Sequence, residues 1–155
     1  MDCKRALTDA DGDAERAKAI LREQGLEKAG KKAGRETSQG LVEAYLHGGG
    51  RIGALVEVNC ETDFVARSDT FKELAREVAM QVAAMNPRFL SKEEAPEEVV
   101  AAEGLTPEQV EGASLLSQPY IRDQSRTIGQ IVAEVVVKTG ENIRVRRFSR
   151  YELGR

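Results

Sequence analysis

The spacing of apolar residues changes along this chain, and that change constrains the fold more than any other feature. From Gly40 apolar and polar residues alternate, and a second alternating run follows Gly48-Gly49-Gly50. A period of two is typical of strands, and two such runs around a glycine-rich turn predict a β-hairpin. The alternating apolar residues are Val42, Ala44 and Leu46 in the first strand, and Ile52, Ala54, Val56 and Val58 in the second.

Apolar residues at helical spacing occur in the sequence both before and after the predicted hairpin. Cys3, Ala6, Leu7 and Ala10 form one stripe, and a second begins after Asp13 as N-cap and stops at Gly25. Two longer helices are predicted within 68–86 and 128–139, and a third strand at 142–152. Aromatic residues make up only 5% of the chain, so the core must be aliphatic. The expected fold class is α+β, with helices packed on a three-stranded antiparallel sheet.

The pattern divides the chain into three expected parts. Residues 1–27 form a partial N-terminal helical module, and residues 28–39 form a basic connector. Residues 40–155 form the α+β core and dimerisation domain. Within this core, residues 91–113 are acidic and interrupted by proline and glycine, and one short helix is predicted to start at Thr106-Pro107-Glu108.

Charge and cysteine content exclude several classes of protein. The chain has 23 Lys and Arg residues and 26 Asp and Glu residues. A protein whose main task is to bind nucleic acid needs an excess of basic residues, so this balance argues against that function. Cys3 and Cys60 form no C-x-x-C pair and fit a reducing, cytoplasmic setting. No apolar run approaches the ~18 residues of a membrane span, and the start lacks the apolar segment of a signal peptide. We therefore expect no nucleic-acid or membrane partner.

Two short motifs look like ligand sites but have the wrong context. Gly48-x-Gly50-x-x-Gly53 matches a dinucleotide-binding pattern, but a strand follows where a helix N-terminus is required. The stretch Asp9 to Asp13 resembles the start of a calcium loop, but Ile20 occupies the position where a bidentate Glu is needed. We therefore predict neither a cofactor nor a metal.

His47 is the only histidine, so a zinc site or a catalytic triad would depend on it alone. No cluster of cysteine, histidine and carboxylate surrounds it in sequence, and no nucleophile elbow is present. An exposed position at the hairpin tip is favoured over catalysis, and it remains compatible with contact to a protein partner. The prediction is that this chain is not an enzyme.

The segment Cys60 to Arg67 joins the second strand to the long helix and carries the strongest local signal. Thr62 can cap a helical turn, and Asp63 is favourable at its positive N-terminus. From the pattern alone, Phe64 folded into the core is the favoured interpretation. The alternative is a wedge, in which the ring enters a pocket of a partner while the carboxylate competes for polar groups nearby.

Several blocks of the chain, in the same order, resemble one known family. Asn59-Cys60-Glu61-Thr62-Asp63-Phe64-Val65-Ala66-Arg67 resembles the central signature of bacterial elongation factor Ts, and Met1-Asp2-Cys3-Lys4-Arg5-Ala6-Leu7 resembles its N-terminal motif. The other matching blocks are Gly12-Asp13, Lys28-Ala29 with Lys31-Lys32-Ala33, Gln118-Pro119-Tyr120, and Gly140-Glu141-Asn142-Ile143-Arg144-Val145-Arg146-Arg147. The chain is similar to the short, single-core form of this family over nearly its whole length.

The resemblance implies a guanine-nucleotide exchange factor that promotes GDP release from the GTPase elongation factor Tu. In the family, an Asp-Phe pair reaches the GTPase domain, and the ring disturbs the Mg²⁺ and phosphate contacts of GDP. By position this pair is Asp63 and Phe64 here, and Thr62 and Val65 flank it in the same signature. The activity needs no acid, base or nucleophile of the exchange factor itself.

The resemblance implies two further contacts with the GTPase. The ubiquitin-associated-like N-terminal module binds the GTPase domain through the motif that contains Met1, Asp2 and Lys4. His47 is a weaker candidate, because Tyr45 to Gly53 resembles a hairpin that contacts another domain of the GTPase.

The chain also departs from the family pattern. Relatives usually have another helix before Met1 and a longer excursion at 101–114, so we expect an incomplete helical module and a shortened loop. Short members form homodimers through their sheets, and some bridge the dimer with a cysteine where this chain has Ser149. A homodimer without a disulfide is therefore expected. The alternative function is a binding protein of the same fold that associates with RNA and does not exchange nucleotide.

Overall fold

The computed structural model describes residues 2–155 and has the mixed architecture that the spacing predicts, α+β. The helices are α1 (Asp2–Asp9), α2 (Ala14–Gly30), α3 (Asp63–Ala66), α4 (Asp69–Met85), α5 (Glu97–Glu103), α6 (Pro107–Ala113) and α7 (Ile128–Thr139), with a 3-10 turn at Leu115–Ser117. The strands are β1 (Gln39–His47), β2 (Ile52–Cys60), β3 (Pro119–Tyr120), β4 (Asp123–Thr127) and β5 (Ile143–Glu152). Within residues 2–155, none of these helices is long and apolar enough to cross a membrane.

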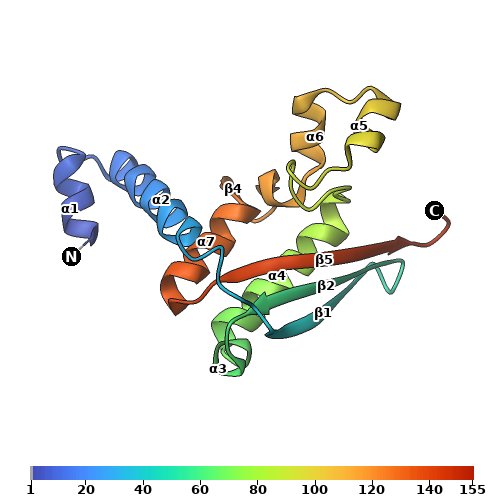
Figure 1. The fold of residues 1–155 in the computed structure, drawn as a ribbon, viewed down its shortest axis with the longest axis horizontal. Helices are drawn as coiled ribbons and strands as arrows, with labels where there is room; N and C mark the ends of the chain where they lie inside the picture. Colours follow the sequence, from blue (N-terminus) through green and yellow to red (C-terminus); the bar gives the residue numbers. More distant parts are fainter. Residues whose placement is uncertain (1) are drawn as a thin grey trace.

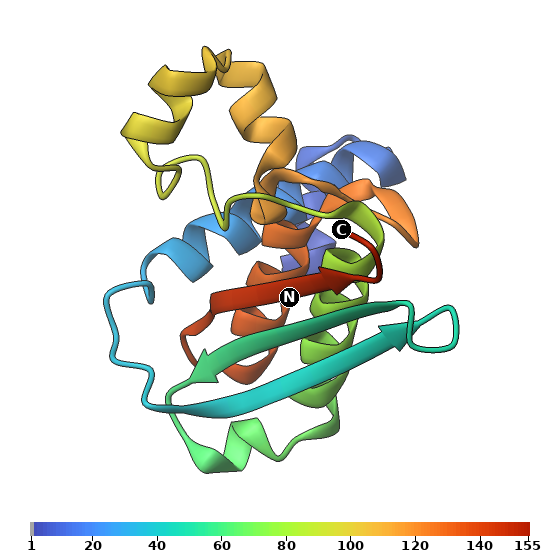
Figure 2. The same ribbon diagram turned by 90° about the vertical axis from the view of Figure 1, so that its right-hand side faces the viewer.

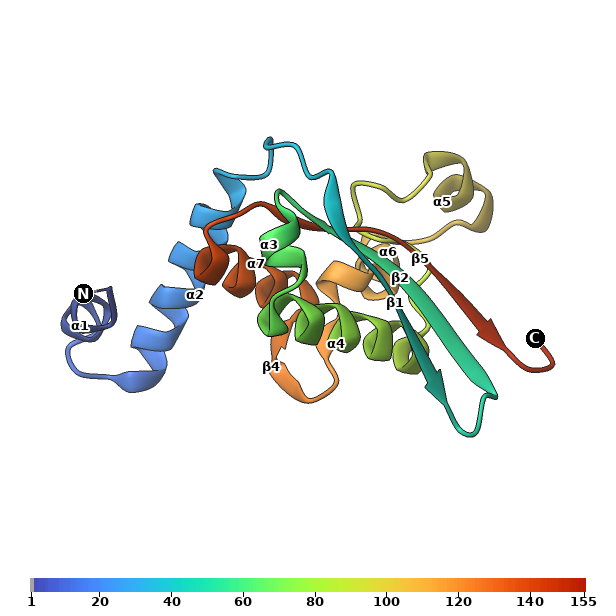
Figure 3. The same ribbon diagram turned by 90° about the horizontal axis from the view of Figure 1, so that it is seen from below.

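A three-stranded antiparallel sheet, in the order β1-β2-β5, forms the centre of the molecule. Helices α4 and α7 cover one face of the sheet, as Figure 3 shows most clearly. Val56 and Val58 of β2 and Val145 of β5 point into this layer and are at most 3% exposed. The large side chains of the core are mostly aliphatic, with Phe71 of α4 as the main aromatic contribution. This confirms the expected aliphatic core between helices and sheet.

The predicted apolar stripe of β1 (Val42, Ala44 and Leu46) lies on the opposite face from the buried Ala54, Val56 and Val58 of β2, so the two stripes of the hairpin do not share one face. Val42 and Leu46 are 59% and 72% exposed, whereas Leu41 and Tyr45 are partly buried against the core. The register explains this, because Leu41 pairs with the buried Val58 and Val42 pairs with Glu57. We call the exposed apolar surface of the sheet the outer sheet face: it consists of Val42, Ala44, Leu46, Leu55 and Tyr151.

The helix ends agree with the sequence at some positions and differ at others. Asp13 caps α2 by accepting a hydrogen bond from the backbone N–H of Arg16, as predicted. However, α2 continues through Gly25 to Gly30, because its second half packs against α7 and that burial outweighs the ~1 kcal/mol cost of an internal glycine. Helix α4 is capped by Ser68, the alternative to Thr70.

The acidic region contains two helices where one was predicted. Thr106 caps α6 in a capping box with Gln109, as its sequence indicates. The extra helix, α5, contains no buried residue, and its seven residues are too few to show a helical period in the sequence. Figure 2 shows α5 and α6 standing together away from the sheet. The short β3–β4 pair was also not predicted, because its strands are brief and one of them is largely polar.

In the described part of the chain, residues 2–155, the buried hydrophobic residues form two separate clusters. The larger lies between the sheet, α4 and α7, and the smaller joins α1 and α2 through Ala6, Ala10 and Ala17. Figure 1 shows α1 and α2 extending from one end of the molecule. The second half of α2 packs against α7, so α2 is shared by the helical extension and the core.

Candidate functional site

The segment predicted to carry function forms a corner at the end of the β1–β2 hairpin opposite its glycine turn (Figure 1). We call residues Cys60 to Arg67 the corner. Its helical turn, α3, begins at Thr62, whose hydroxyl accepts a hydrogen bond from the backbone N–H of Val65 at 3.3 Å. Val65 and Ala66 are buried at 6% and 7% exposure, so they attach the turn to the core.

Phe64 points away from the core. Its side chain is 83% exposed, the highest exposure among the large hydrophobic residues described. The interpretation favoured from the pattern alone, Phe64 folded into the core, is therefore wrong, because Val65 and Ala66 take the inward positions of this short turn. Asp63 lies beside it and pairs with Arg67 at 3.1 Å, with both side chains more than half exposed.

The backbone of the corner is held by a residue from a distant part of the chain. Glu141, between α7 and β5, accepts hydrogen bonds from the backbone N–H groups of Glu61 and Thr62, both at 3.1 Å. Its second carboxylate oxygen accepts from the hydroxyl of Thr62 at 2.6 Å. Hydrogen bonds to an ionised carboxylate are about twice as strong as neutral ones. The start of α3 is thus fixed in position relative to the end of α7.

Asn142 extends this network to the connector. Its backbone N–H donates to the carboxylate of Glu61 at 2.6 Å, and its side-chain amide donates to the carbonyl oxygens of Ala33 and Arg35 at 3.2 and 2.8 Å. Asn142 is only 5% exposed, so these bonds satisfy a buried amide that would otherwise be costly. The corner, the α7–β5 junction and the end of α2 therefore meet at one place.

Cys60 closes the inner side of the corner. Its thiol is fully buried and donates a hydrogen bond to the carbonyl oxygen of Thr62 at 3.2 Å. Burial, reinforced by the charge of Glu141, raises the pKa of the Cys60 thiol to about 11. The thiol therefore remains protonated at neutral pH and acts as a donor within the fold.

The N-terminal candidates lie on the helical extension, far along the chain from the corner. Lys4 is exposed on α1, and Asp2 pairs with Lys28 at 2.7 Å and with Arg5 at 3.1 Å. The hydrogen bond from Lys28 lowers the pKa of Asp2. Met1 lies outside the described residues. The Asp2–Lys28 pair ties the start of α1 to α2, which leads toward the connector.

His47 lies at the other end of the hairpin from Phe64. It ends β1, and the nine residues of β2 separate the two ends, which corresponds to about 30 Å at the usual strand rise. His47 is exposed and stacks on Tyr45, with ring centroids 6.2 Å apart. The structure therefore does not bring His47 and the Asp63-Phe64 pair into one site.

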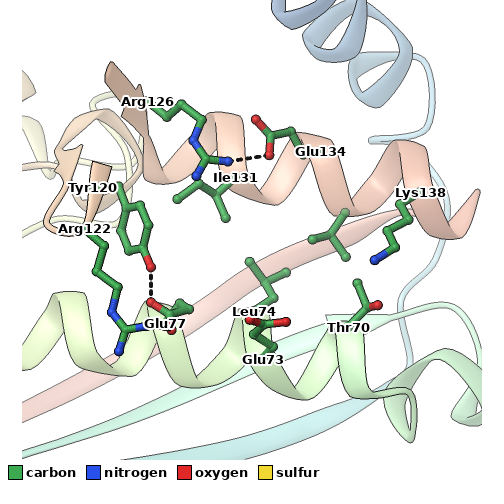
Figure 4. A pocket seen from close by; sticks show the side chains of 11 residues that line it. Thr70, Glu73, Leu74, Glu77, Tyr120, Arg122, Arg126, Ile131, Glu134 and Lys138 are labelled. Carbon is green, nitrogen blue, oxygen red and sulfur yellow. Dashed lines mark hydrogen bonds and ion pairs between the residues drawn. The ribbon is translucent and has the colours of Figure 1, made fainter. Parts of the chain in front are cut away.

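A charged cleft of about 290 Å³ lies between α4 and α7 (Figure 4), away from all the predicted residues. Its groups pair with one another: Tyr120 donates a hydrogen bond to Glu77, Arg122 pairs with Glu77 at 3.1 Å, and Arg126 pairs with Glu134 at 2.7 Å. The burial of Tyr120 and its bond to Glu77 raise its pKa to about 12. These contacts tie β3–β4 to the two helices. Among residues 2–155, no group of three or more His, Cys, Asp or Glu could hold a metal ion.

Sequence reasoning did not assign a role to Glu141 or Asn142. Both belong to a block that resembles the family, Gly140 to Arg147, but about 80 positions separate them from the corner. Only the fold brings the two blocks together, through the β2–β5 pairing that places Cys60 opposite Ile143. The available signal was a polar Glu-Asn pair directly before an apolar strand and directly after a helix-ending glycine.

Comparison with known proteins identifies the family of this chain. The family model for elongation factor TS matches residues 19–110. Elongation factor Ts of Caldanaerobacter subterraneus subsp. tengcongensis is 49% identical to this chain, covering 99% of it and 88% of the relative. The factors of Carboxydothermus hydrogenoformans and Syntrophomonas wolfei are 48% and 49% identical over 99% of this chain, covering 82% and 83% of their own lengths. The chain therefore belongs to the elongation factor Ts family of translation elongation factors.

Proposed function

We propose that this protein is a guanine-nucleotide exchange factor that binds elongation factor Tu·GDP and promotes GDP release in the cytoplasm. The observation that carries the proposal is the exposed Phe64 beside Asp63, on a corner whose backbone is fixed by hydrogen bonds. Membership of the family supplies the identity of the GTPase.

Phe64 is suited to insertion into a partner. Leaving the ring in water is unfavourable, and burying a phenylalanine side chain contributes roughly 1.5–3 kcal/mol. The Asp63–Arg67 pair is exposed and contributes little to stability, so the Asp63 carboxylate can exchange Arg67 for groups of the partner. Thr62 and Val65 have supporting roles in this proposal, because one caps the turn and the other anchors it in the core.

The exchange step follows from linked binding. A factor that binds the nucleotide-free GTPase more tightly than the GDP form must weaken GDP binding by the same factor. Rebinding of nucleotide then releases the factor. The protein supplies shape and charge at the corner, and no bond is made or broken.

The helical module supplies a second contact in this proposal. We retain the division into residues 1–27, 28–39 and 40–155, which is supported by the separate alanine cluster between α1 and α2. Lys4 is exposed there, and Asp2 lies at the start of the same helix. We propose that Met1, Asp2 and Lys4 bind the GTPase domain and that His47 contacts another domain.

The outer sheet face supports a homodimer. It places Leu46, Leu55 and Tyr151 at 72%, 48% and 76% exposure on one side of the sheet. Ser149 pairs with Leu55 at the middle of this surface, where some relatives have a bridging cysteine. A second copy packed on the same face would bury these side chains. Sedimentation experiments at increasing salt concentration test this part of the proposal. We expect the mass of a dimer at every salt concentration, because the proposed contacts are apolar.

Release of a fluorescent GDP analogue from elongation factor Tu tests the exchange function. We expect strong acceleration by the protein at saturating concentration, and about a 100-fold loss in Phe64→Ala, which corresponds to roughly 2.7 kcal/mol of lost coupling. Leu153→Ala is the matched control, because Leu153 is 69% exposed and lies near the C-terminus. It should retain full activity.

Two outcomes would contradict the proposal. A folded protein that does not accelerate GDP release is not an exchange factor. If Phe64→Ala is as active as the unmodified protein, insertion of Phe64 into the GTPase is not the cause of exchange. The dependence of binding on salt concentration distinguishes the RNA-associated alternative. Affinity for RNA falls steeply as ionic strength rises, whereas the affinity of an apolar side chain for a pocket does not.

A further inference from the structure

We infer that Glu141 is a positioning residue for Phe64, and that with Asn142 it holds the corner and the connector to the N-terminal helices in one fixed geometry. This inference rests on the proposed exchange function and extends it to residues that do not touch the GTPase. The carboxylate of Glu141 fixes the two backbone N–H groups that precede α3 and the hydroxyl that caps it.

The need for such a residue follows from the shape of the corner. Helix α3 has four residues, too few for a stable helix in isolation, and Phe64 is its second residue. With an 83% exposed ring, Phe64 receives little support from neighbouring side chains. Its direction is therefore set by the backbone of the turn, which the buried Val65 and Ala66 anchor on one side and which Glu141 binds on the other, at Glu61 and Thr62.

The network is reciprocal, which makes it rigid. Glu141 accepts from the backbone of Glu61 and Thr62, while Glu61 accepts from the backbone of Asn142 at 2.6 Å. Two adjacent residues on each side are thus cross-linked. A wedge works by occupying one position in the partner, so loosening its base lowers the fraction of bound complexes in which the ring is inserted.

Asn142 adds the second half of the inference. Its amide donates to the carbonyl oxygens of Ala33 and Arg35, and Lys32 donates to the carbonyl oxygen of Gly140 at 2.7 Å. These bonds fix the chain just after α2. The distance between the helical module and Phe64 is therefore set before binding, so both can meet one partner without a further entropic cost.

A double-mutant cycle tests whether Glu141 acts through Phe64. We expect Glu141→Ala to lower the maximal rate of GDP release about tenfold, with unchanged far-ultraviolet circular dichroism. In the Phe64→Ala background the same change should lower the rate less than twofold, because the group being positioned is gone. A tenfold effect in both backgrounds would overturn the inference, since it would show that Glu141 acts independently of Phe64.

The variant Glu141→Gln tests whether the loss of rate in Glu141→Ala comes from missing hydrogen bonds or from general structural damage. Its amide oxygen can accept from the backbone N–H groups, and its NH₂ can donate to the Thr62 hydroxyl in place of the original bond. We expect the maximal rate to recover to within about threefold of the unmodified protein. Failure of this variant, with the fold intact, would contradict positioning by hydrogen bonds. Glu98→Ala is the matched control, because Glu98 is an exposed carboxylate on the distant helix α5.

A second readout does not require the GTPase. The chain contains no tryptophan, so Phe64→Trp places a single fluorophore at the corner. Its residual anisotropy should fall when Glu141→Ala is added and stay constant with Glu98→Ala. If anisotropy falls but the unmodified protein releases no GDP, the exchange function fails and the positioning role remains. If exchange occurs and anisotropy is unchanged, the positioning role fails alone.

Discussion

The two ends of the β1–β2 hairpin both present exposed side chains, but they are built differently. At the corner, the side chain of Glu141 binds the backbone beside Phe64, and the side chain of Glu61 binds the backbone N–H of Asn142. At the tip, three glycines with positive φ make the turn, and the carbonyl oxygen of His47 accepts from Gly50 and Arg51. The corner is fixed by a side chain from a distant segment, whereas the tip is held by backbone hydrogen bonds, two local ones and one from the N–H of Leu153 to the carbonyl oxygen of Arg51.

The difference shows that exposure is not sufficient to identify a binding residue. Phe64 and His47 are both exposed, yet only Phe64 lies beside a backbone that a side chain from a distant segment holds. Ordering a loop on binding opposes association, so a residue held in place before contact contributes more of its burial energy. This supports Phe64 as the principal contact and His47 as a weaker one.

The largest expected effect comes from glycine replacements at the two ends. Gly40 pairs with Asn59 next to the corner, with φ of +147°, and an added Cβ would lie 2.1 Å from the carbonyl oxygen of Val58. Gly40→Ala should therefore lower the free energy of unfolding by more than ~3 kcal/mol. Gly49→Ala at the tip meets open space and should cost about 1 kcal/mol for its positive φ. If urea unfolding gives the same loss of stability for Gly40→Ala and Gly49→Ala, the two ends of the hairpin are not built differently at these glycines.

A smaller effect is expected from the pH dependence of the corner. The pKa of the Cys60 thiol is raised to about 11 in the folded protein, whereas an unfolded thiol ionises near pH ~8.5. Because the unfolded state loses its proton first, this stabilisation is fully present below about pH 8.5 and is lost as pH rises toward 11.

The measurement is the difference in unfolding free energy between the protein and Cys60→Ala. This difference should shrink by about 2 kcal/mol between pH 7 and pH 10.5. Cys3→Ala, at an exposed thiol, controls for thiol removal as such. A constant difference would mean that the interior of the corner is open to solvent, as the tip is.

The smallest effects are expected from the surface contacts of each end. Arg67→Ala removes the exposed pair with Asp63, and Tyr45→Phe removes the 3.4 Å contact with His47. Each should change the free energy of unfolding by less than about 0.5 kcal/mol, because exposed polar contacts contribute little. A loss of 2 kcal/mol for Arg67→Ala would instead show that the ion pair, and not Glu141, holds the corner.

Local signals predicted the elements whose causes are local. Asp13 and Thr106 were identified as helix starts because capping is a property of a few adjacent residues. The end of α2 was misplaced at Gly25, because packing on α7 decides it. The faces of β1 were assigned without the register, and pairing with β2 turns Val42 outward.

The site was predictable only in part for the same reason. Asp63 and Phe64 were named through their resemblance to a family signature, while the pattern alone favoured a buried Phe64. The direction of that ring depends on which residues of a short turn find room in the core, and Val65 and Ala66 take that room. Glu141 was not identified because its partners lie about 80 positions away.

The separate alanine cluster of α1 and α2 has a consequence for local unfolding. Regions with their own small core open as separate cooperative units, at a lower free energy than the whole domain. Ala6, Ala10 and Ala17 bury little area, so amide hydrogens of α1 should exchange with solvent well before those of α4. A partner that binds α1 would then slow hydrogen exchange in α1 without altering exchange in the sheet. Protection of this single helix would therefore report the binding of the partner.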